Sequence, residues 1–576
     1  MLGSLKKTTP NLISIIIKLS IKMLSETKNI LLQQLVQNAT NEELIYAKGY
    51  LAGYLAKNFG IQATGVIPPV QTTAIAIKPL IVYGTETGNS KKVASQIQAT
   101  FKKNKIQAKS VDVAQFDLAK LQKETHVLFV VSTQGEGEFP QNAVGFYEAI
   151  KAFNGKLDKL SFAVFGLGDS SYPLFCNAGV LLDAVLAEKG ATRLLPLVKA
   201  DVDYASLIPI WETDLQNAFG AKTTATPALV KSAVAATSHK QHFTGQISHK
   251  IVLNDSGSNK ETYHIEITPN EEVIYEPGDA LGLIPKNNET ELQSIASYFK
   301  VTDVAILQDK NIRGLSKKSL ENIAKVFEIE ISEEKADLVD IIKKYQPKKG
   351  TLEEVVAVLH PIAPRLYSIS SAAEAHDGQV HLTVNLNSFK VGDTIKTGLT
   401  SQFLADYPLD TDYDFYIHKN NNFRLPAEDA DIILIGPGTG IAPFRSFLAQ
   451  RDATGAEGKN WLFFGEQHFA FDFYYQTEIQ EWLSTGVLTK LSTAFSRDQE
   501  RKIYVQDRIK ENASQFNEWL ENGASIYICG QKDPMSKDVE NTIIEVIASQ
   551  RNISVEKAKE VLDQLEEQGK YQKDVY

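Results

Sequence analysis

A short loop between a predicted strand and a predicted helix contains residue types that bind phosphate. It follows the apolar run 79–84 and is rich in hydroxyl side chains. Hydroxyls and free backbone N–H groups at a helix start can hold a phosphate dianion without a lysine. A capped helix without a ligand has the same pattern, so this loop alone does not distinguish a phosphate site from a helix cap. The residues expected at the phosphate are Thr85, Glu86, Thr87, Gly88, Asn89 and Ser90.

Two later loops follow the apolar runs 126–131 and 162–168. Parallel sheets bind ligands at the carboxyl ends of their strands, so these loops are expected beside the first. Their glycines permit close approach of a flat ring, and Tyr172 offers a face for stacking. Three such loops indicate a ligand site more strongly than one. The residues expected around the ring are Ser132, Thr133, Gln134, Gly135, Leu167, Gly168, Asp169, Ser170, Ser171, Tyr172, Pro173, Leu174, Phe175 and Cys176.

A third motif places a guanidinium and an aromatic ring on one face of a predicted strand. Side chains two residues apart in a strand share a face, so Arg365 and Tyr367 point the same way. The arginine could grip a pyrophosphate while the tyrosine stacks on a flavin. A barrel strand with a surface arginine is the alternative, and the motif alone would favour it. The residues of this motif are Arg365, Leu366, Tyr367 and Ser368.

A cluster of hydroxyl and cationic side chains at 496–504 suits a nucleotide 2′-phosphate. A site for NAD usually presents a carboxylate to the ribose diol instead. Asp498 lies in this segment, and we interpret it as a solvated loop acid. The sequence therefore predicts NADPH rather than NADH. The residues expected there are Ser496, Arg497, Lys502, Ile503, Tyr504, Val505 and Gln506.

These loops require sheets to position them. Apolar runs alternate with helical stretches over 76–218 and again over 429–576, which predicts two doubly wound parallel sheets. Alternating strands interrupted by a helical insert at about 289–360 predict a β-barrel within 241–428. An Ala/Thr/Ser-rich segment, 219–240, is typical of a flexible tether. The predicted fold class is therefore α/β and multidomain, with a doubly wound sheet whose loops resemble those of flavodoxins (a flavodoxin-like sheet), a barrel and a second nucleotide-binding sheet.

The composition excludes several other classes of protein. A net charge of −10 argues against broad nonspecific nucleic-acid binding. Two cysteines exclude a disulfide scaffold, and ten scattered histidines without an H-E-x-x-H pattern predict no metal site. A reducing cytoplasmic location is the simplest expectation.

The first residues contain an apolar stretch, 12–21, that is too short to span a bilayer. We expect residues 1–22 to be an upstream extension, with Met23 as the true start. Residues 23–73 are expected to form an N-terminal helical segment and a linker. No membrane partner is expected.

Together the motifs resemble those of the diflavin reductases, most specifically in the string GPGTGIAPFR at 436–445. The resemblance covers 79–218 well and 361–576 closely. It implies FMN at the first sheet, FAD at the barrel and NADPH at the second sheet. It also implies further cofactor contacts from Thr383, Val384, Asn385, Phe389, Gly398, Leu399, Thr400, Ser401, Gly438, Thr439 and Asp538.

The resemblance assigns three polar residues to the contact between nicotinamide and FAD. They are Ser368, Cys529 and Asp574, which would support hydride transfer electrostatically and by position. The terminal Tyr576 would cover the FAD ring and move when nicotinamide enters. Gln134 stands where many eukaryotic relatives have tyrosine, so stacking on FMN is expected from one side.

The terminal run YQKDVY is similar to that of sulfite reductase flavoproteins within this family. This implies that electrons pass from NADPH to FAD, to FMN and then to a hemoprotein subunit of sulfite reductase that carries siroheme and an iron–sulfur cluster. One alternative is a diflavin reductase serving another heme or redox acceptor. Another is a nonenzymatic nucleotide-binding sensor. The N-terminal region is expected to mediate homo-oligomerisation.

Overall fold

The computed structural model describes residues 77–576, apart from 221–240 and the positions 87, 136, 171, 173, 203, 392 and 393. The described residues lie within one compact unit, Ala76–Tyr576. The expected upstream extension, the N-terminal helical segment and the tether beyond residue 220 lie outside the described residues. Among the described residues, no helix is long and apolar enough to cross a membrane.

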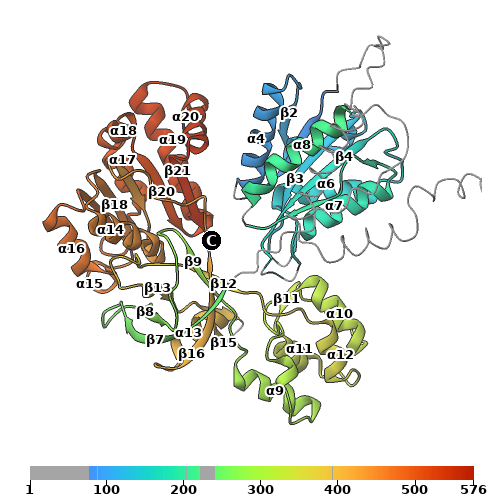
Figure 1. Cartoon of the computed structure of the whole chain (residues 1–576). Coiled ribbons are helices and arrows are strands. Elements are labelled where there is room, and N and C mark those ends of the chain that lie inside the picture. The colour runs from blue at the N-terminus through green and yellow to red at the C-terminus, as the bar shows by residue number, and fades with distance from the viewer. Residues whose placement is uncertain are drawn as a thin grey trace, which may run out of the picture. The chain divides into compact units, whose positions relative to one another are not determined.

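The first domain is a parallel sheet in the order β2-β1-β3-β4-β5, with β6 paired to β4. Helices cover both faces of this sheet (Figure 1). The strands are β1 (Leu80–Gly84), β2 (Lys109–Asp112), β3 (His126–Ser132), β4 (Ser161–Leu167), β5 (Thr192–Arg193) and β6 (Val198–Ala200). The helices are α4 (Asn89–Lys103), α5 (Leu118–Leu121), α6 (Gln141–Ala152), α7 (Asn177–Glu188) and α8 (Leu207–Gly220).

Alternation along the strands divides the core of this domain into two layers. Ile81 packs with the apolar face of α4 and with Trp211 of α8. The next residue, Val82, packs on the opposite face with α6 and α7. Helix α4 buries its residues at helical spacing, with Val93 fully buried, as the sequence pattern predicts. Two covered faces define a doubly wound sheet.

The second domain is an antiparallel barrel in the order β12-β9-β16-β7-β8-β13. An antiparallel bridge between Ile369 and Leu382 joins the two ends of this order and closes the barrel. Its strands are β7 (His242–Val252), β8 (Thr262–Pro269), β9 (Ala280–Leu283), β12 (Arg365–Ser368), β13 (Val380–Asn385) and β16 (Asp412–His418). A hairpin of β14 (Ser388–Val391) and β15 (Thr394–Thr397), followed by α13 (Leu399–Asp406), adjoins the barrel.

The insert between β9 and β12 is mostly helical and has a hydrophobic core of its own, centred on residues such as Ile323 and Leu338. Its elements are α9 (Glu289–Phe299), β10 (Leu315–Ser316), α10 (Lys317–Phe327), β11 (Lys335–Ala336), α11 (Leu338–Tyr345) and α12 (Leu352–Val358).

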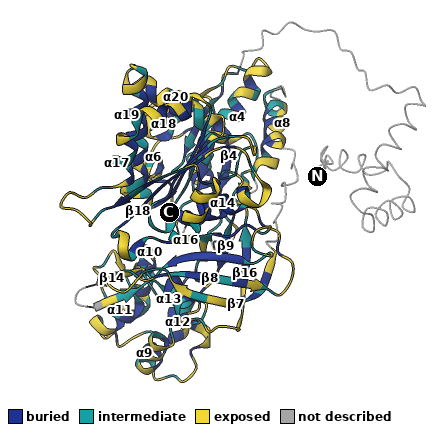
Figure 2. Cartoon of the chain, turned by 90° about the vertical axis from the view of Figure 1, so that its left-hand side faces the viewer, coloured by how far each residue is buried: buried dark blue, intermediate teal, exposed yellow. Residues whose placement is uncertain are grey.

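The third domain is a parallel sheet in the order β19-β18-β17-β20-β21. Its helices are buried toward the sheet and exposed on their outer sides (Figure 2). The strands are β17 (Ile432–Ile435), β18 (Asn460–Glu466), β19 (Lys490–Phe495), β20 (Ser525–Gly530) and β21 (Tyr571–Val575). The helices are α14 (Ala442–Thr454), α15 (Phe469–Asp472), α16 (Gln476–Thr485), α17 (Val505–Glu511), α18 (Ala513–Glu521), α19 (Lys537–Arg551) and α20 (Val555–Glu567).

The predicted fold class is confirmed, with two differences in its strands. The apolar run at 193–202, which on sequence alone predicts one strand, is divided between β5 and β6. The terminal run YQKDVY, which carries no strong strand signal, forms β21 in parallel register with β20. The pairing of β21 with β20 places Asp574 opposite Cys529, two of the residues predicted for the site.

Candidate functional site

One cavity of about 2470 Å³ is lined by residues from the two sheets and the barrel. Predicted site residues that line it are Asn89, Ser132, Thr133, Gln134, Gly135, Leu167, Gly168, Asp169, Tyr172, Leu174, Phe175, Cys176, Arg365, Leu366, Tyr367, Ser368, Thr383, Asn385, Phe389, Gly398, Leu399, Thr400, Ser401, Gly438, Thr439, Ser496, Tyr504, Val505, Gln506, Asp538 and Tyr576. Predicted residues outside this lining are Thr85, Glu86, Gly88, Ser90, Ser170, Val384, Arg497, Lys502, Ile503, Cys529 and Asp574. Thr87, Ser171 and Pro173 lie outside the described residues.

The loop before α4 has the geometry of an anion cradle. Gly88 adopts a left-handed conformation with φ 86°, and its N–H donates to Thr85 Oγ1 at 3.0 Å. Ser90 is fully buried, and its hydroxyl has no hydrogen-bond partner among the described residues. A buried hydroxyl without a partner is costly, and a phosphate oxygen would supply the missing bond. The loop therefore fits a phosphate.

Glu86, predicted for the same loop, is engaged elsewhere. Its carboxylate accepts from the backbone N–H of Gln141 at 3.0 Å and forms an ion pair with Lys532 of the third domain. Burial alone would raise the pKa of Glu86, but the bonds from Lys532 and Gln141 lower it below its usual value. Glu86 is therefore held as a carboxylate facing a cation.

The loops after β3 and β4 are stabilised by bonds within the first domain. The turn after β3 is closed by backbone bonds between Gln134 and Glu138, with Gly135 at φ 50°. In the loop after β4, the Ser170 N–H donates to Asp201 at 3.0 Å and its hydroxyl bonds to the same carboxylate. Ser170 therefore holds its own loop, whereas Tyr172 lines the cavity.

Cys176 ends the same loop as a buried packing residue. Its φ is 56°, and its thiol donates to the carbonyl of Gly166 at 3.3 Å. A Cβ on Gly168 would lie 2.8 Å from the Cys176 backbone nitrogen, so the tight fold of this loop requires glycine. Burial raises the pKa of Cys176 to about 12, and the thiol stays neutral.

On the barrel, β12 presents its predicted motif to the cavity. The Arg365 side chain is exposed and makes no hydrogen bond or ion pair with the described residues. Burial raises the pKa of Tyr367 to about 12, so its hydroxyl remains protonated. This combination of a free guanidinium and a neutral aromatic ring fits a pyrophosphate and a flavin.

Segments β13, β14 and the start of α13 also lie at the cavity and could contact a ligand in different ways. Thr383 of β13 lines the cavity, whereas Val384 is fully buried in the barrel core, so only its backbone can reach a ligand. Helix α13 begins after Gly398, and its first-turn N–H groups have no intrahelical partner. Phe389 of β14 is 47% exposed.

The loop after β17 packs tightly against β20. A Cβ on Gly440 would lie 2.2 Å from the carbonyl oxygen of Cys529, so only glycine permits this approach. The Thr439 hydroxyl lies 2.5 Å from the hydroxyl of Tyr576. The loop, the end of β20 and the terminal residue thus meet at one point.

The segment after β19 leaves two cations exposed. Arg497 and Lys502 make no side-chain hydrogen bond or ion pair with the described residues. Asp498, by contrast, accepts from the backbone N–H of Phe469 at 2.8 Å and lies 2.9 Å from His468 Nδ1. The carboxylate of Asp498 is thus occupied at the start of α15, so the loop offers cations to a ligand.

The polar trio is assembled by the pairing of β20 with β21. Cys529 and Asp574 are register partners, with the sulfur 4.0 Å from Asp574 Oδ2. The Ser368 hydroxyl donates to the same oxygen at 2.8 Å. Burial raises the pKa of Asp574, a shift that the bond from Ser368 partly offsets. Burial, together with the nearby Asp574, raises the pKa of Cys529 well above its usual value.

Comparison with known proteins identifies the family. Models of three domain families match the chain: Flavodoxin over residues 81–208, FAD binding domain over 308–403 and Oxidoreductase NAD-binding domain over 434–541. The chain is 36% identical over 590 residues to the "Sulfite reductase [NADPH] flavoprotein alpha-component" of Bacillus subtilis (strain 168), covering 95% of this chain and 97% of that protein. It is 38% identical over 592 residues, with the same coverage, to the protein of that name from Shewanella sp. (strain MR-4). The chain belongs to this family of sulfite reductase flavoproteins.

The family matches agree with the chemistry of the residues. The unpartnered hydroxyl of Ser90 fits an FMN phosphate, and the free guanidinium of Arg365 fits the FAD pyrophosphate. The predicted flavodoxin-like, FAD-binding and nucleotide-binding domains are confirmed by the matches. The roles of individual residues stay predictions.

The structure adds site residues that the sequence reading missed. Asn420, in a polar run after β16, has its Nδ2 3.5 Å from Asp574 Oδ1. Lys260 and Glu466 line the cavity and form an ion pair at 2.5 Å. The only sequence signal for Asn420 is the asparagine run at the carboxyl end of a strand, and no pattern links Lys260 to Glu466.

Proposed function

We propose that this chain oxidises NADPH and passes the electrons through FAD and then FMN to a sulfite reductase hemoprotein, which reduces sulfite to sulfide with six electrons. The observation that carries the proposal is the meeting of Ser368, Asp574 and Cys529 beside the contact between Thr439 and Tyr576. This meeting brings β12, which would bind FAD, next to the loop after β17, which would bind the nicotinamide nucleotide.

The bound cofactors would supply hydride and single-electron chemistry. The residues of the chain then have distinct tasks. Ser368 donates a hydrogen bond to Asp574, which fixes the hydroxyl beside the nicotinamide position. The protonated thiol of Cys529 adds a neutral, polarisable neighbour. Tyr576, 65% exposed and held through Thr439, would move when nicotinamide enters.

The other predicted residues would bind the cofactors. The loops before α4 and after β3 and β4 would hold FMN, with stacking on one side because Gln134 replaces an aromatic ring. Segments β12, β13 and the start of α13 would hold FAD. Arg497 and Lys502 would contact the 2′-phosphate of NADPH, and Asp538 another part of the nucleotide.

The partners and location follow from the same proposal. The chain offers no siroheme or iron–sulfur ligands in its sequence pattern, so the hemoprotein would provide them. Two buried unpaired thiols, Cys176 and Cys529, accord with a reducing cytoplasm. The N-terminal helices expected at 23–60 would mediate homo-oligomerisation.

Stopped-flow absorbance under anaerobic conditions tests the first half of the proposal. NADPH should bleach the flavin bands of the holoenzyme, and NADH should do so much more slowly. A nonenzymatic sensor would show no bleaching with either nucleotide. Adding the hemoprotein and sulfite should then yield sulfide. Bleaching without sulfide, but with reduction of a cytochrome or a flavodoxin-dependent enzyme, would point to another acceptor.

A further inference from the structure

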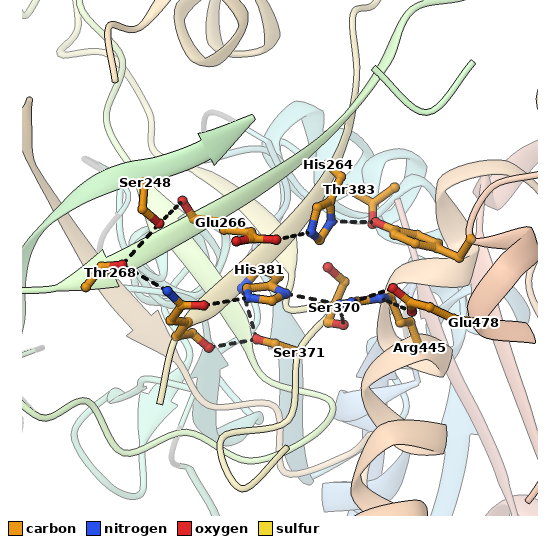
Figure 3. Close-up of polar contacts among 12 residues, drawn as sticks. Ser248, His264, Glu266, Thr268, Ser370, Ser371, His381, Thr383, Arg445 and Glu478 are labelled. Atoms are coloured by element: carbon orange, nitrogen blue, oxygen red, sulfur yellow. Dashed lines mark hydrogen bonds and ion pairs between the residues drawn. The ribbon is translucent and has the colours of Figure 1, made fainter. Parts of the chain in front are cut away.

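A buried polar cluster joins the barrel to the third domain. Figure 3 shows strand residues His264, Glu266 and His381 facing helix residues Arg445 and Glu478. Arg445 lies in the first turns of α14, the helix that starts directly after the nucleotide loop Gly438–Ile441. We call this group of residues the Arg445 cluster.

Arg445 uses its guanidinium to connect the two domains. Its Nε and Nη2 donate to the carboxylate of Glu478 at 2.6 and 2.9 Å, a bidentate pair within the third domain. Its Nη1 crosses to the barrel, where it donates to the carbonyl of Ser370 at 2.8 Å and lies 3.2 Å from His381 Nδ1. The Arg445 residue is 5% exposed, so these bonds form out of water.

The donors of Arg445 fix the proton on His381. A guanidinium can only donate, so His381 Nδ1 must accept, and the ring proton lies on Nε2, 3.3 Å from Gln379 Oε1. Burial, followed by the charge of Arg445, lowers the pKa of His381 to about 2 and that of His264 to about 3. Both rings are therefore neutral, and Glu478 is the carboxylate that pairs directly with Arg445.

This arrangement argues against a metal site, although His264, Glu266 and His381 have ligand atoms within 4.8 Å of one another. A metal needs a free lone pair on each histidine, and both nitrogens of His381 are already committed. His264 is bound on both sides as well, to the Tyr475 hydroxyl at 3.1 Å and to Glu266 at 3.2 Å.

The cluster reaches two segments predicted to hold FAD. Ser370 lies two residues after Ser368, in the chain that leaves β12. The hydroxyl of Ser446, beside Arg445 on α14, donates to the next carbonyl, Ser371, at 2.6 Å. Two adjacent helix residues thus hold two consecutive carbonyls, which fixes both the distance and the orientation of this strand end. On β13, the Thr383 hydroxyl lies 2.6 Å from the Tyr475 hydroxyl.

We propose that Arg445 is a positioning residue for hydride transfer. It holds the strand end that carries Ser368 against the helix that carries the nucleotide loop, and so sets the spacing between the FAD and nicotinamide sites. The inference rests on the proposed reduction of FAD by NADPH. A 1 Å error in such spacing is enough to slow a transfer about 100-fold.

Arg445→Lys tests the proposal, because lysine keeps the charge but loses the planar fork. Arg451→Lys is the matched control. Arg451 lies on the same helix and is 3% exposed, but its Nη2 binds only carbonyls at 428, 430 and 458, near its own sheet. The measurement is the limiting rate of FAD reduction by NADPH and by NADPH deuterated at the transferred position, together with the nucleotide Kd and flavin content.

For Arg445→Lys we expect the limiting rate to fall about tenfold or more and the isotope effect to change, with Kd and flavin content within about twofold of the wild type. Arg451→Lys should keep both the rate and the isotope effect. If the wild type is not reduced by NADPH, the proposed function fails. If the wild type is reduced and Arg445→Lys is equally fast, or if both variants slow alike, the positioning proposal fails.

Ser446→Ala is a second variant, which tests the proposal even if Arg445→Lys misfolds. It removes one of the two carbonyl clamps without burying a charge, so it should slow hydride transfer by a smaller factor and retain FAD. A full rate in Ser446→Ala combined with loss of FAD from Arg445→Lys would assign the cluster a purely structural role.

Zinc at stoichiometric concentration should change neither the absorbance nor the rate of the wild type, and tight zinc binding would contradict the proton assignment on His381.

Discussion

Cys529 and Asp574 face each other in register across the parallel strands β20 and β21, with the sulfur 4.0 Å from the carboxylate. The same oxygen accepts the Ser368 hydroxyl from the barrel. A contact between two domains therefore depends on the pairing of the last strand of the chain.

Replacing Asp574 by Asn should slow hydride transfer by about 100- to 1000-fold, the range seen when one electrostatic contact at a reacting centre is lost. The amide keeps the shape and can still accept from Ser368, so flavin content should be unchanged. Anaerobic stopped-flow reduction by NADPH measures the effect. An unchanged limiting rate would remove Asp574 from the site of transfer.

The same variant should gain stability at neutral pH. The pKa of Asp574 is raised in the folded protein, so the folded state binds this proton more tightly than the unfolded state. Its contribution favours folding below the unfolded pKa and is lost as pH rises through the folded pKa. Asp574→Asn cannot ionise, so its Tm should exceed that of the wild type at pH 7, and the difference should shrink as pH falls through the raised folded pKa toward about 4, the pKa of an unfolded aspartate. A constant difference across this range would contradict the shift.

Neither thiol should react in the native protein. Cys176 and Cys529 are fully buried, and burial raises the pKa of both. Titration with a chromogenic disulfide reagent should detect no rapid thiol before unfolding and the two cysteines of the sequence afterwards. Rapid modification of one native thiol would show that one of these loops opens readily.

Local patterns were sufficient to predict the sheets and the loops at their ends. Val93, Ile97 and Phe101 repeat at helical spacing, and all three are fully buried on α4. The apolar run before residue 436 likewise becomes the buried strand β17. These features depend on neighbours close in sequence, so their period reveals them.

Long-range partners could not be predicted in this way. The terminal run mixes charges with aromatics, and it becomes β21 only because β20 offers an unpaired edge. Glu86 was expected at a phosphate, but its carboxylate pairs with Lys532. Val384 was expected to contact FAD, but its side chain fills the barrel core. Such outcomes depend on which side chains meet after folding, and no periodicity encodes them.

Ser90→Ala should affect the apoprotein and the holoprotein in opposite directions. The buried hydroxyl has no partner among the described residues, so its removal should leave the apoprotein as stable or slightly more stable. If the hydroxyl binds the FMN phosphate, the same change should weaken FMN binding about tenfold. Thermal melting of the flavin-free protein and fluorescence titration with FMN measure the two effects. Ser110→Ala, at a part-buried hydroxyl bonded to Gln98, is the control and should leave FMN affinity unchanged.

Arg497→Ala should abolish much of the preference for NADPH over NADH. Its exposed guanidinium has no partner among the described residues, whereas the neighbouring Asp498 is held by His468 and the start of α15. A charge-assisted bond to a 2′-phosphate contributes about 1.5–3 kcal/mol, so the KM for NADPH should rise about 10- to 100-fold while that for NADH changes little. Arg501→Ala is the charge-matched control, because Arg501 is already paired with Asp507 at 2.8 Å. The prediction is contradicted if the ratio of kcat/KM for NADPH and NADH is unchanged in Arg497→Ala. It is also contradicted if Arg501→Ala loses as much of the preference for NADPH, because the effect would then not depend on a contact between Arg497 and the 2′-phosphate.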